Sequence, residues 1–168
     1  MVAKIITGGQ SGVDRAATDF AIESGIPYGG FVPLGGWAED YPNPPGVIAD
    51  YPEFVETTSS RPLLRTFFNI QHSGAVLIIR RDGDTSFGTD VTYDFASMEK
   101  ASHVVSPDSP AAAESIDMFL DSFPDDIVLC VGGPRESESP GIYAVTLTIL
   151  RSTSLAASLP SERQPTLF

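Results

Sequence analysis

Three glycines stand close together where the first apolar segment of the chain gives way to a helical pattern. They lie in the run Gly8-Gly9-Gln10-Ser11-Gly12, and apolar residues then recur at helical spacing from Val13 to Ala21. Glycines let backbone N–H groups approach a ligand, and a helix N-terminus adds unpaired N–H groups and a positive dipole end. The pattern indicates a site for phosphate or a similar anion, although a tight turn without a ligand would account for the same glycines.

The same run differs from the two best-known nucleotide-binding motifs. It lacks the Gly-Lys-Ser/Thr ending of a Walker loop, so hydrolysis of Mg-nucleotides gains no support. It also lacks the G-x-G-x-x-G spacing of the dinucleotide fingerprint. The sequence shows no Ser-His-Asp or Cys-His pattern, so we name no catalytic residue.

Two later junctions carry similar chemistry. Gly88-Thr89 precedes a predicted helix that contains Thr92, and Gly132-Gly133-Pro134-Arg135 follows the last predicted strand. Because the carboxyl ends of parallel strands lie along one edge of a sheet, we expect all three glycine turns to face one crevice. There the two threonines offer hydroxyls, and Arg135 offers a guanidinium fork for phosphate or carboxylate. The alternatives are that Thr89 caps its helix and that Arg135 pairs with a neighbouring glutamate.

Arg65 and Asn69 form a further pair of candidates. They lie one helical turn apart in the predicted helix 62–71, on a face offset from its apolar residues. Both side chains can reach into the crevice from there, but a solvated helix face is the simpler interpretation when the residues are considered alone.

Strand-like and helix-like segments alternate along the chain, which is typical of a mostly parallel sheet with helices on both faces. We therefore predict an α/β fold, with a single Rossmann-like domain over residues 1–158 and a flexible C-terminal tail over 159–168. The predicted strands are 4–7, 75–79, 103–105 and 127–131, and the predicted helices begin near residues 13, 62, 90, 110 and 141. The helix side chains that we expect against the sheet include Leu64, Phe67, Phe68, Val91, Phe95 and Met98.

The segment 34–51 is rich in glycine, proline, aspartate and aromatic residues, which predicts a long ordered loop. Loops of this length are usually functional or disordered, and the aromatic residues Trp37, Tyr41 and Tyr51 favour a function.

Composition limits the class of protein. The chain has 168 residues, of which 42% are hydrophobic, and a net charge of -12, which disfavours nucleic-acid backbones and anionic membranes as partners. No signal peptide or membrane span is evident, so we expect a cytoplasmic protein. The single cysteine, Cys130, ends an apolar strand and is expected to be a core residue. Because the whole chain has only this one cysteine and two histidines, we expect no metal site built by the protein.

Several segments, in this order, resemble the molybdenum carrier family, the molybdenum-cofactor carrier proteins. They are Gly8 to Ala17, Ala38-Glu39-Asp40, Arg65-Thr66 with Asn69, Gly88-Thr89 with Thr92, and Gly133-Pro134-Arg135-Glu136-Ser137 with Pro140-Gly141-Ile142. The resemblance extends from Lys4 to about Leu150. This family is a branch of the Rossmann-like superfamily that includes the lysine-decarboxylase-like LOG proteins and the DNA-processing protein DprA.

The resemblance implies a Rossmann-like fold, a homo-oligomer (dimer or tetramer), and a carrier that binds and protects a phosphate-bearing small molecule. The implied ligand is molybdenum cofactor (Mo-molybdopterin), a pterin with a terminal phosphate and a dithiolene-held oxo-molybdenum. Together with the glycine turns, the resemblance predicts a set of ligand-binding residues: Gly8, Gly9, Gln10, Ser11, Gly12, Arg15, Arg65, Asn69, Gly88, Thr89, Thr92, Gly133, Pro134, Arg135, Glu136 and Ser137.

The sequence departs from its relatives at two informative places. Ser11 stands where the family usually has threonine, and Cys130-Val131-Gly132 stands where Asn-Val-Ala is common, which removes a polar contact. The LOG-type relatives are phosphoribohydrolases with a glutamate after the Gly-Thr turn, whereas Asp90-Val91-Thr92 follows that turn here. We therefore favour a non-catalytic carrier and keep two alternatives, a nucleoside-monophosphate phosphoribohydrolase and a nucleotide-sensing module.

Overall fold

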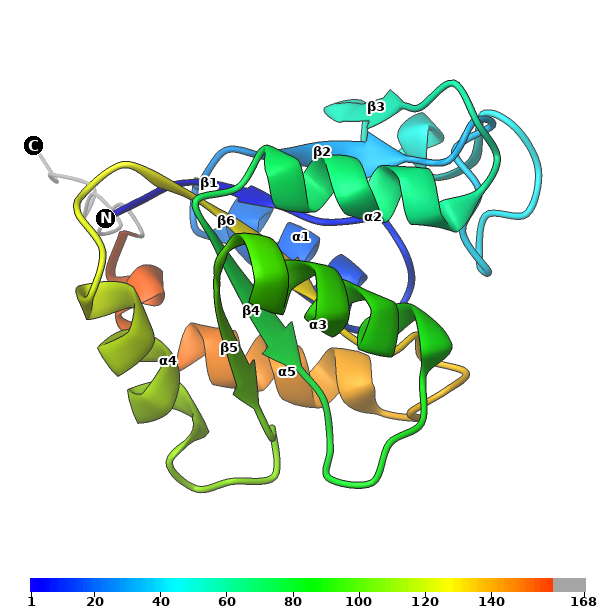
Figure 1. The fold of residues 1–168 in the computed structure, drawn as a ribbon. Coiled ribbons are helices and arrows are strands. Elements are labelled where there is room, and N and C mark those ends of the chain that lie inside the picture. The colour runs from blue at the N-terminus through cyan, green and yellow to red at the C-terminus, as the bar shows by residue number, and fades with distance from the viewer. Residues whose placement is uncertain (159–168) are drawn as a thin grey trace, which may run out of the picture.

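Six parallel strands form the centre of the molecule (Figure 1). The computed structural model describes residues 1–158, and the predicted tail, 159–168, lies outside the described residues. The strands are β1 (Val2–Ile6), β2 (Tyr28–Val32), β3 (Phe54–Glu56), β4 (Ala75–Ile79), β5 (Ala101–Val105) and β6 (Ile127–Gly132). They lie in the order β3-β2-β1-β6-β4-β5, and every pairing is parallel. The predicted α/β fold with a parallel sheet is confirmed.

Five α-helices cover the two faces of this sheet. They are α1 (Val13–Glu23), α2 (Pro62–Gln71), α3 (Phe87–Glu99), α4 (Ala112–Asp121) and α5 (Ile142–Arg151), with short 3-10 helices η1 (Gly46–Ala49) and η2 (Ser154–Ser158). Helices α1, α4 and α5 pack on one face, and α2 and α3 pack on the other (Figure 1). Within residues 1–158, no helix has the length and apolar character needed to cross a bilayer.

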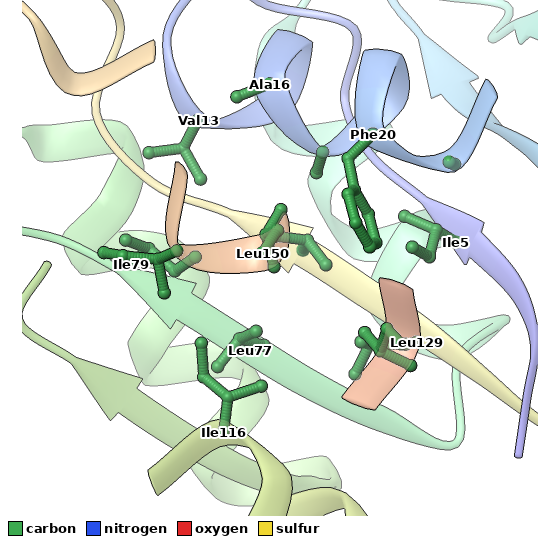
Figure 2. Packing of buried hydrophobic residues seen from close by; sticks show 14 of the residues in the cluster. Ile5, Val13, Ala16, Phe20, Leu77, Ile79, Ile116, Leu129 and Leu150 are labelled. Carbon is green, nitrogen blue, oxygen red and sulfur yellow. The ribbon is translucent and has the colours of Figure 1, made fainter. Parts of the chain in front are cut away.

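Strand β4 separates two apolar layers. Its side chains are fully buried, as the continuous apolar run predicts. Leu77 and Ile79 join the larger core, in which Phe20 of α1 is the largest buried side chain (Figure 2). Val76 and Ile78 point to the opposite face and pack beneath α2 and α3. The sheet is therefore covered on both sides at the point where β4 lies.

Helix α2 is oriented differently from the prediction. Phe67 is 41% exposed and Leu64 and Phe68 are only half-buried, whereas Asn69 and Ile70 are buried. We expected Leu64, Phe67 and Phe68 to face the sheet. This expectation is wrong for Phe67 and only partly correct for Leu64 and Phe68. The inward face is partly polar: Ile70 joins the apolar layer, and beside it the amide of Asn69 bonds to backbone groups at the ends of β1 and β2.

Helix α3 begins at Phe87, three residues before the predicted start, because the Ser86 side chain accepts the N–H of Thr89 and caps the helix there. Its inward side chain near the C-terminal end is Ala96, which is fully buried. Met98 is 72% exposed, which corrects its expected burial. Since each residue turns a helix by about 100°, a side chain two positions after Ala96 points away from the sheet.

Candidate ligand-binding site

The three glycine turns meet at one cavity of about 350 Å³, at the carboxyl edge of the sheet. Gly8 follows β1, Gly88 and Thr89 lie in the first turn of α3, and Gly133 follows β6, and all four line the cavity. The chain leaves β1 toward β2 and leaves β4 toward β5, so the cavity lies where the strand order reverses. Such switch points are the usual ligand sites of open α/β sheets.

The predicted residues divide between this cavity and its surroundings. Those that line the cavity are Gly8, Gln10, Arg65, Asn69, Gly88, Thr89, Thr92, Gly133 and Arg135. Those that line a separate, shallower depression of about 570 Å³ are Ser11, Gly12, Arg15, Glu136 and Ser137. Gly9 and Pro134 line neither: Gly9 lies against Val32, and the Pro134 carbonyl accepts the N–H of Val13 at 3.3 Å.

Asp14 satisfies the backbone of the first glycine turn from within the protein. Its Oδ2 accepts the N–H of Gly8 at 3.1 Å and the N–H of Gln10 at 3.4 Å, while the N–H of Gly9 bonds to Thr7 Oγ1 at 3.1 Å. These amides are therefore not open to a ligand, which differs from the expectation. Burial raises the pKa of Asp14, although Arg65 and the two amides act in the opposite direction.

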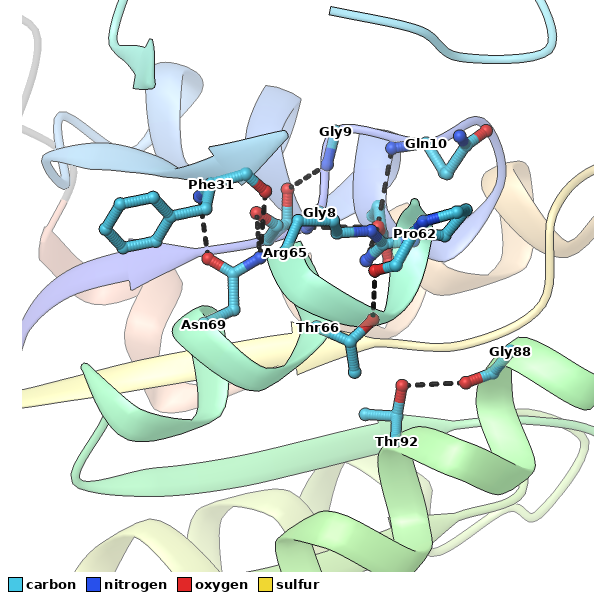
Figure 3. A network of polar contacts seen from close by, with 12 residues as sticks. Gly8, Gly9, Gln10, Phe31, Pro62, Arg65, Thr66, Asn69, Gly88 and Thr92 are labelled. Atoms are coloured by element: carbon cyan, nitrogen blue, oxygen red, sulfur yellow. Dashed lines mark hydrogen bonds and ion pairs between the residues drawn. The ribbon is translucent and has the colours of Figure 1, made fainter. Parts of the chain in front are cut away.

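Arg65 brings a positive charge to the cavity and lies directly on Gly8 (Figure 3). A Cβ added to Gly8 would come within 1.7 Å of the guanidinium Nη1, so only glycine admits this approach. Nη1 lies 3.8 Å from Asp14 Oδ2, and the buried Nε has no hydrogen-bond partner in the part of the chain that the structure describes. The solvated-face alternative for Arg65 is therefore wrong.

Asn69 lines the cavity wall, but its side-chain amide is hydrogen-bonded to backbone groups (Figure 3). Oδ1 accepts the N–H of Phe31 at 2.7 Å, and Nδ2 donates to the carbonyls of Phe31 at 3.0 Å and Thr7 at 3.1 Å. Asn69 thus fastens α2 to the carboxyl ends of β1 and β2 and helps to position Arg65 one turn earlier.

The start of α3 forms another side of the cavity. Ser86 Oγ accepts from the backbone and the hydroxyl of Thr89 and donates to Glu138 at 3.0 Å. The Thr92 hydroxyl donates to the carbonyl of Gly88 at 2.8 Å (Figure 3). Ser86 thus takes the N–H of Thr89 with its side chain and that of Asp90 with its carbonyl, so within the described residues the first turn of α3 offers only the N–H groups of Phe87 and Gly88 at the cavity.

Arg135 combines the two alternatives that the sequence left open, because it lines the cavity and is also paired with glutamates. Its Nη2 lies 3.1 Å from Glu138 Oε1, and its Nη1 lies 3.9 Å from Glu39 Oε2. The Glu138 carboxylate also accepts the backbone N–H of Arg135 at 3.0 Å. Burial opposes ionisation of Glu138, but these bonds and that from Ser86 hold its pKa below the ordinary value.

The long loop 34–51 lies against the first glycine turn, and the predicted set of ligand-binding residues lacks two of its members. Trp37 lines the cavity, and Glu39 links separate segments by accepting hydrogen bonds from the hydroxyls of Ser11 and Ser137. The aromatic composition of the loop and the Ala38-Glu39-Asp40 segment were available signals for both residues. Their partners are distant in sequence, however, and only the fold brings them together.

Arg15 orders this loop from outside the cavity. Its guanidinium pairs with Asp40 at 2.8 Å and lies between the rings of Tyr41 and Tyr51, 4.9 and 5.0 Å from their centroids. These contacts hold the loop in place, so Arg15 orders the loop and does not line the cavity.

Cys130 lies within β6, is buried, and is one of the residues that line the cavity. Burial, reinforced by the nearby Asp14 side chain, raises the pKa of its thiol to about 12. The thiol is therefore protonated at neutral pH, as suits a core residue. Among residues 1–158, no group of three or more His, Cys, Asp or Glu side chains could hold a metal ion.

Comparisons with known proteins agree with this architecture. Residues 5–154 match the model of the circularly permutated YpsA SLOG family. The crystal structure of a putative molybdenum carrier protein from Syntrophus aciditrophicus SB is 36% identical, with a TM-score of 0.80. The similarity covers 89% of this chain and 93% of that one. None of the curated proteins matches the chain.

Proposed function

Because the chain belongs to the circularly permutated YpsA SLOG family, we propose that it binds and shields a phosphate-bearing small molecule in the cavity between its three glycine turns. The observation that carries this proposal is the Arg65 guanidinium at the cavity wall, whose buried Nε lacks a partner within residues 1–158. An unsatisfied buried donor costs about 1–3 kcal/mol, and a ligand phosphate would satisfy it. The N–H groups of Phe87 and Gly88 at the start of α3 and the Arg135 side chain would supply further donors.

Molybdenum cofactor is the ligand that we propose first. The similar structure from Syntrophus aciditrophicus carries the name of a molybdenum carrier. The cavity volume of about 350 Å³ falls in the range of roughly 300–1,000 Å³ typical of small-ligand pockets. Leu63, Ile70 and Val91 line it together with the two arginines, which suits a planar pterin joined to a phosphate. Molybdenum would enter bound to the dithiolene, so the protein need contact only the organic part.

The acidic side chains in and near the cavity are better suited to a carrier than to a hydrolase. Asp90, the first acidic residue after the Gly-Thr turn, pairs with Arg80 at 2.7 Å, and its side chain is 56% exposed. It is not among the residues that line the cavity. Glu138 does line the cavity, but its hydrogen bonds hold it ionised, whereas glycosidic cleavage needs a protonated acid beside the leaving group. Asp14 also lines the cavity, and its Oδ2 is engaged by the N–H groups of Gly8 and Gln10.

Ligand binding is tested by calorimetry and thermal unfolding with inorganic phosphate, AMP and isolated molybdenum cofactor. We expect the true ligand to raise the melting temperature of the wild type, because it binds only the folded state. Arg65→Ala should abolish this shift, and Arg151→Ala, which alters an exposed arginine at the end of α5, should not. If none of the three compounds binds, the proposal is wrong.

Carriage itself is tested by mixing the protein with molybdenum cofactor in air and following the loss of cofactor. A decay slower than with an inert protein supports a carrier. Release of free adenine from AMP would instead favour the phosphoribohydrolase.

We also propose that the protein is a homo-oligomer. Large apolar side chains outside the cavity are exposed on α2 and α3, among them Phe67 and Met98. Exposed apolar groups of this kind are typical of surfaces that associate. Sedimentation equilibrium at several concentrations tests this, and a monomer at all of them would refute it.

A further inference from the structure

Trp37 is the single tryptophan of the chain, and it lies at the edge of the cavity. The residue is 37% exposed, although most large apolar side chains of the surrounding loop are buried or half-buried. Within the described residues, the indole stacks on no aromatic ring and carries no cation over its face. More than a third of Trp37 is therefore open to solvent beside the cavity, with no aromatic or cationic partner among residues 1–158.

The backbone on both sides of Trp37 is fixed. Its carbonyl accepts a hydrogen bond from Gln10 Nε2 at 3.3 Å, and Gln10 Oε1 accepts the N–H of Glu39 at 3.2 Å. Between these two bonds, Ala38 is fully buried and exchanges backbone hydrogen bonds with Tyr41. Because Gln10 belongs to the first glycine turn, the loop is fastened to the same turn on which Arg65 lies.

The loop is also held from the far side. Glu39 accepts hydrogen bonds from the N–H of Ser137, at 3.2 Å, and from the hydroxyl of Ser11. Gly36 makes a close approach to the Pro45 carbonyl that a Cβ would block, since it would lie 2.2 Å from that oxygen. An exposed aromatic side chain on so constrained a backbone is preorganised, which lowers the entropy lost when a ligand stacks on it.

We propose that Trp37 stacks on the planar heteroaromatic ring of a ligand whose phosphate is bound by Arg65. This inference rests on the proposed function and names the class of ligand: a pterin or purine joined to a phosphate, in preference to a sugar phosphate without a ring system. Stacking on an aromatic side chain contributes to affinity without requiring a particular base, because every heterocycle of this kind has a π-face. Trp37 then sets the preference for ring-bearing ligands, and Arg65 sets the preference for phosphate.

Tryptophan fluorescence tests the inference directly, because all of the signal comes from Trp37. The probes are AMP and neopterin phosphate, which carry a ring, and ribose 5-phosphate, which does not. We expect the ring-bearing probes to quench the emission, and ribose 5-phosphate to bind by calorimetry with little quenching.

Variants separate stacking from a general effect on the site. Trp37→Ala should weaken binding of the preferred ring-bearing probe roughly tenfold and leave ribose 5-phosphate binding unchanged, whereas Trp37→Phe should retain most of the affinity. Tyr93→Ala, at an exposed aromatic residue outside the cavity, should change neither. If Trp37→Ala weakens the binding of both kinds of probe equally, or of neither, Trp37 does not stack on the ligand. The proposal that the cavity binds a phosphate would still stand. If the wild type binds molybdenum cofactor or inorganic phosphate but none of these three probes, this inference fails and the proposed function stands. If it binds none of the five compounds, both fail.

Discussion

The side chain of Asp14 accepts the backbone N–H of Gly8 at 3.1 Å, and so occupies the turn that the glycine pattern assigns to a ligand anion. Asp14 is buried and lies 3.8 Å from the guanidinium of Arg65, which lies on the same glycine. The turn is thus a preformed arrangement of protein groups, with the arginine as its charged contact to the cavity.

Asp14 should make the protein less stable as the pH rises. Burial raises its pKa, so the folded state binds more protons than the unfolded state between the ordinary aspartate pKa and the raised one. The contribution of Asp14 to the free energy of unfolding is therefore greatest below the ordinary pKa and declines as the pH rises through the raised value. Asp14→Asn should remove this component, which urea unfolding of both proteins across that interval measures.

Asp125→Asn is a suitable control, because that carboxyl is exposed and its pKa is lowered by the N-terminal amine. A difference between wild type and Asp14→Asn that does not vary with pH would contradict the prediction.

Asn69→Ala should lower the free energy of unfolding by roughly 2–4 kcal/mol, because the N–H and carbonyl of Phe31 and the carbonyl of Thr7 lose their side-chain partner. The exposed Gln71→Ala on the same helix should cost less than about 0.5 kcal/mol. Urea unfolding measures both. Unchanged stability with lost ligand binding would instead make Asn69 a ligand contact.

The parts of the fold that were predictable depend on local patterns. Strand β4 matches its prediction residue for residue, because a short, continuous apolar run between a helix and a loop is typical of a strand buried on both faces. The meeting of the glycine turns followed from the geometry of parallel strands alone. The orientation of α2 did not follow, because its aromatic residues occupy more than one face and periodicity does not reveal that Asn69 bonds to β1 and β2.

The missed parts of the site depend on contacts between distant residues. Glu39 and Ser137 are 98 positions apart, and nothing in either local segment indicates that they are hydrogen-bonded. The same holds for Trp37, whose carbonyl is held by Gln10 from 27 positions away. The three-residue edge strand β3 was also missed, since so short a segment gives no measurable alternation.

The Cys130 thiol should be unreactive in the folded protein. Burial raises its pKa to about 12, so very little thiolate is present at neutral or mildly alkaline pH. Ellman's reagent should label it slowly in buffer and rapidly in denaturant, with one thiol released per chain because Cys130 is the single cysteine. Rapid labelling of the native protein would mean that β6 opens readily around Cys130 or that the cavity admits the reagent.

Gly8→Ala should abolish phosphate-ligand binding with little loss of stability. The added Cβ would lie 1.7 Å from Nη1 of Arg65, and a flexible guanidinium can move aside more easily than backbone can. Gly12→Ala is the informative contrast, because Gly12 has a φ of +72° and its Cβ would lie 2.4 Å from the Pro134 carbonyl oxygen. Gly12→Ala should therefore destabilise the folded protein itself, which a lower melting temperature in the absence of ligand would show. If Gly8→Ala binds phosphate ligands as tightly as the wild type does, Arg65 does not hold the phosphate, since the substitution must displace its guanidinium from the turn.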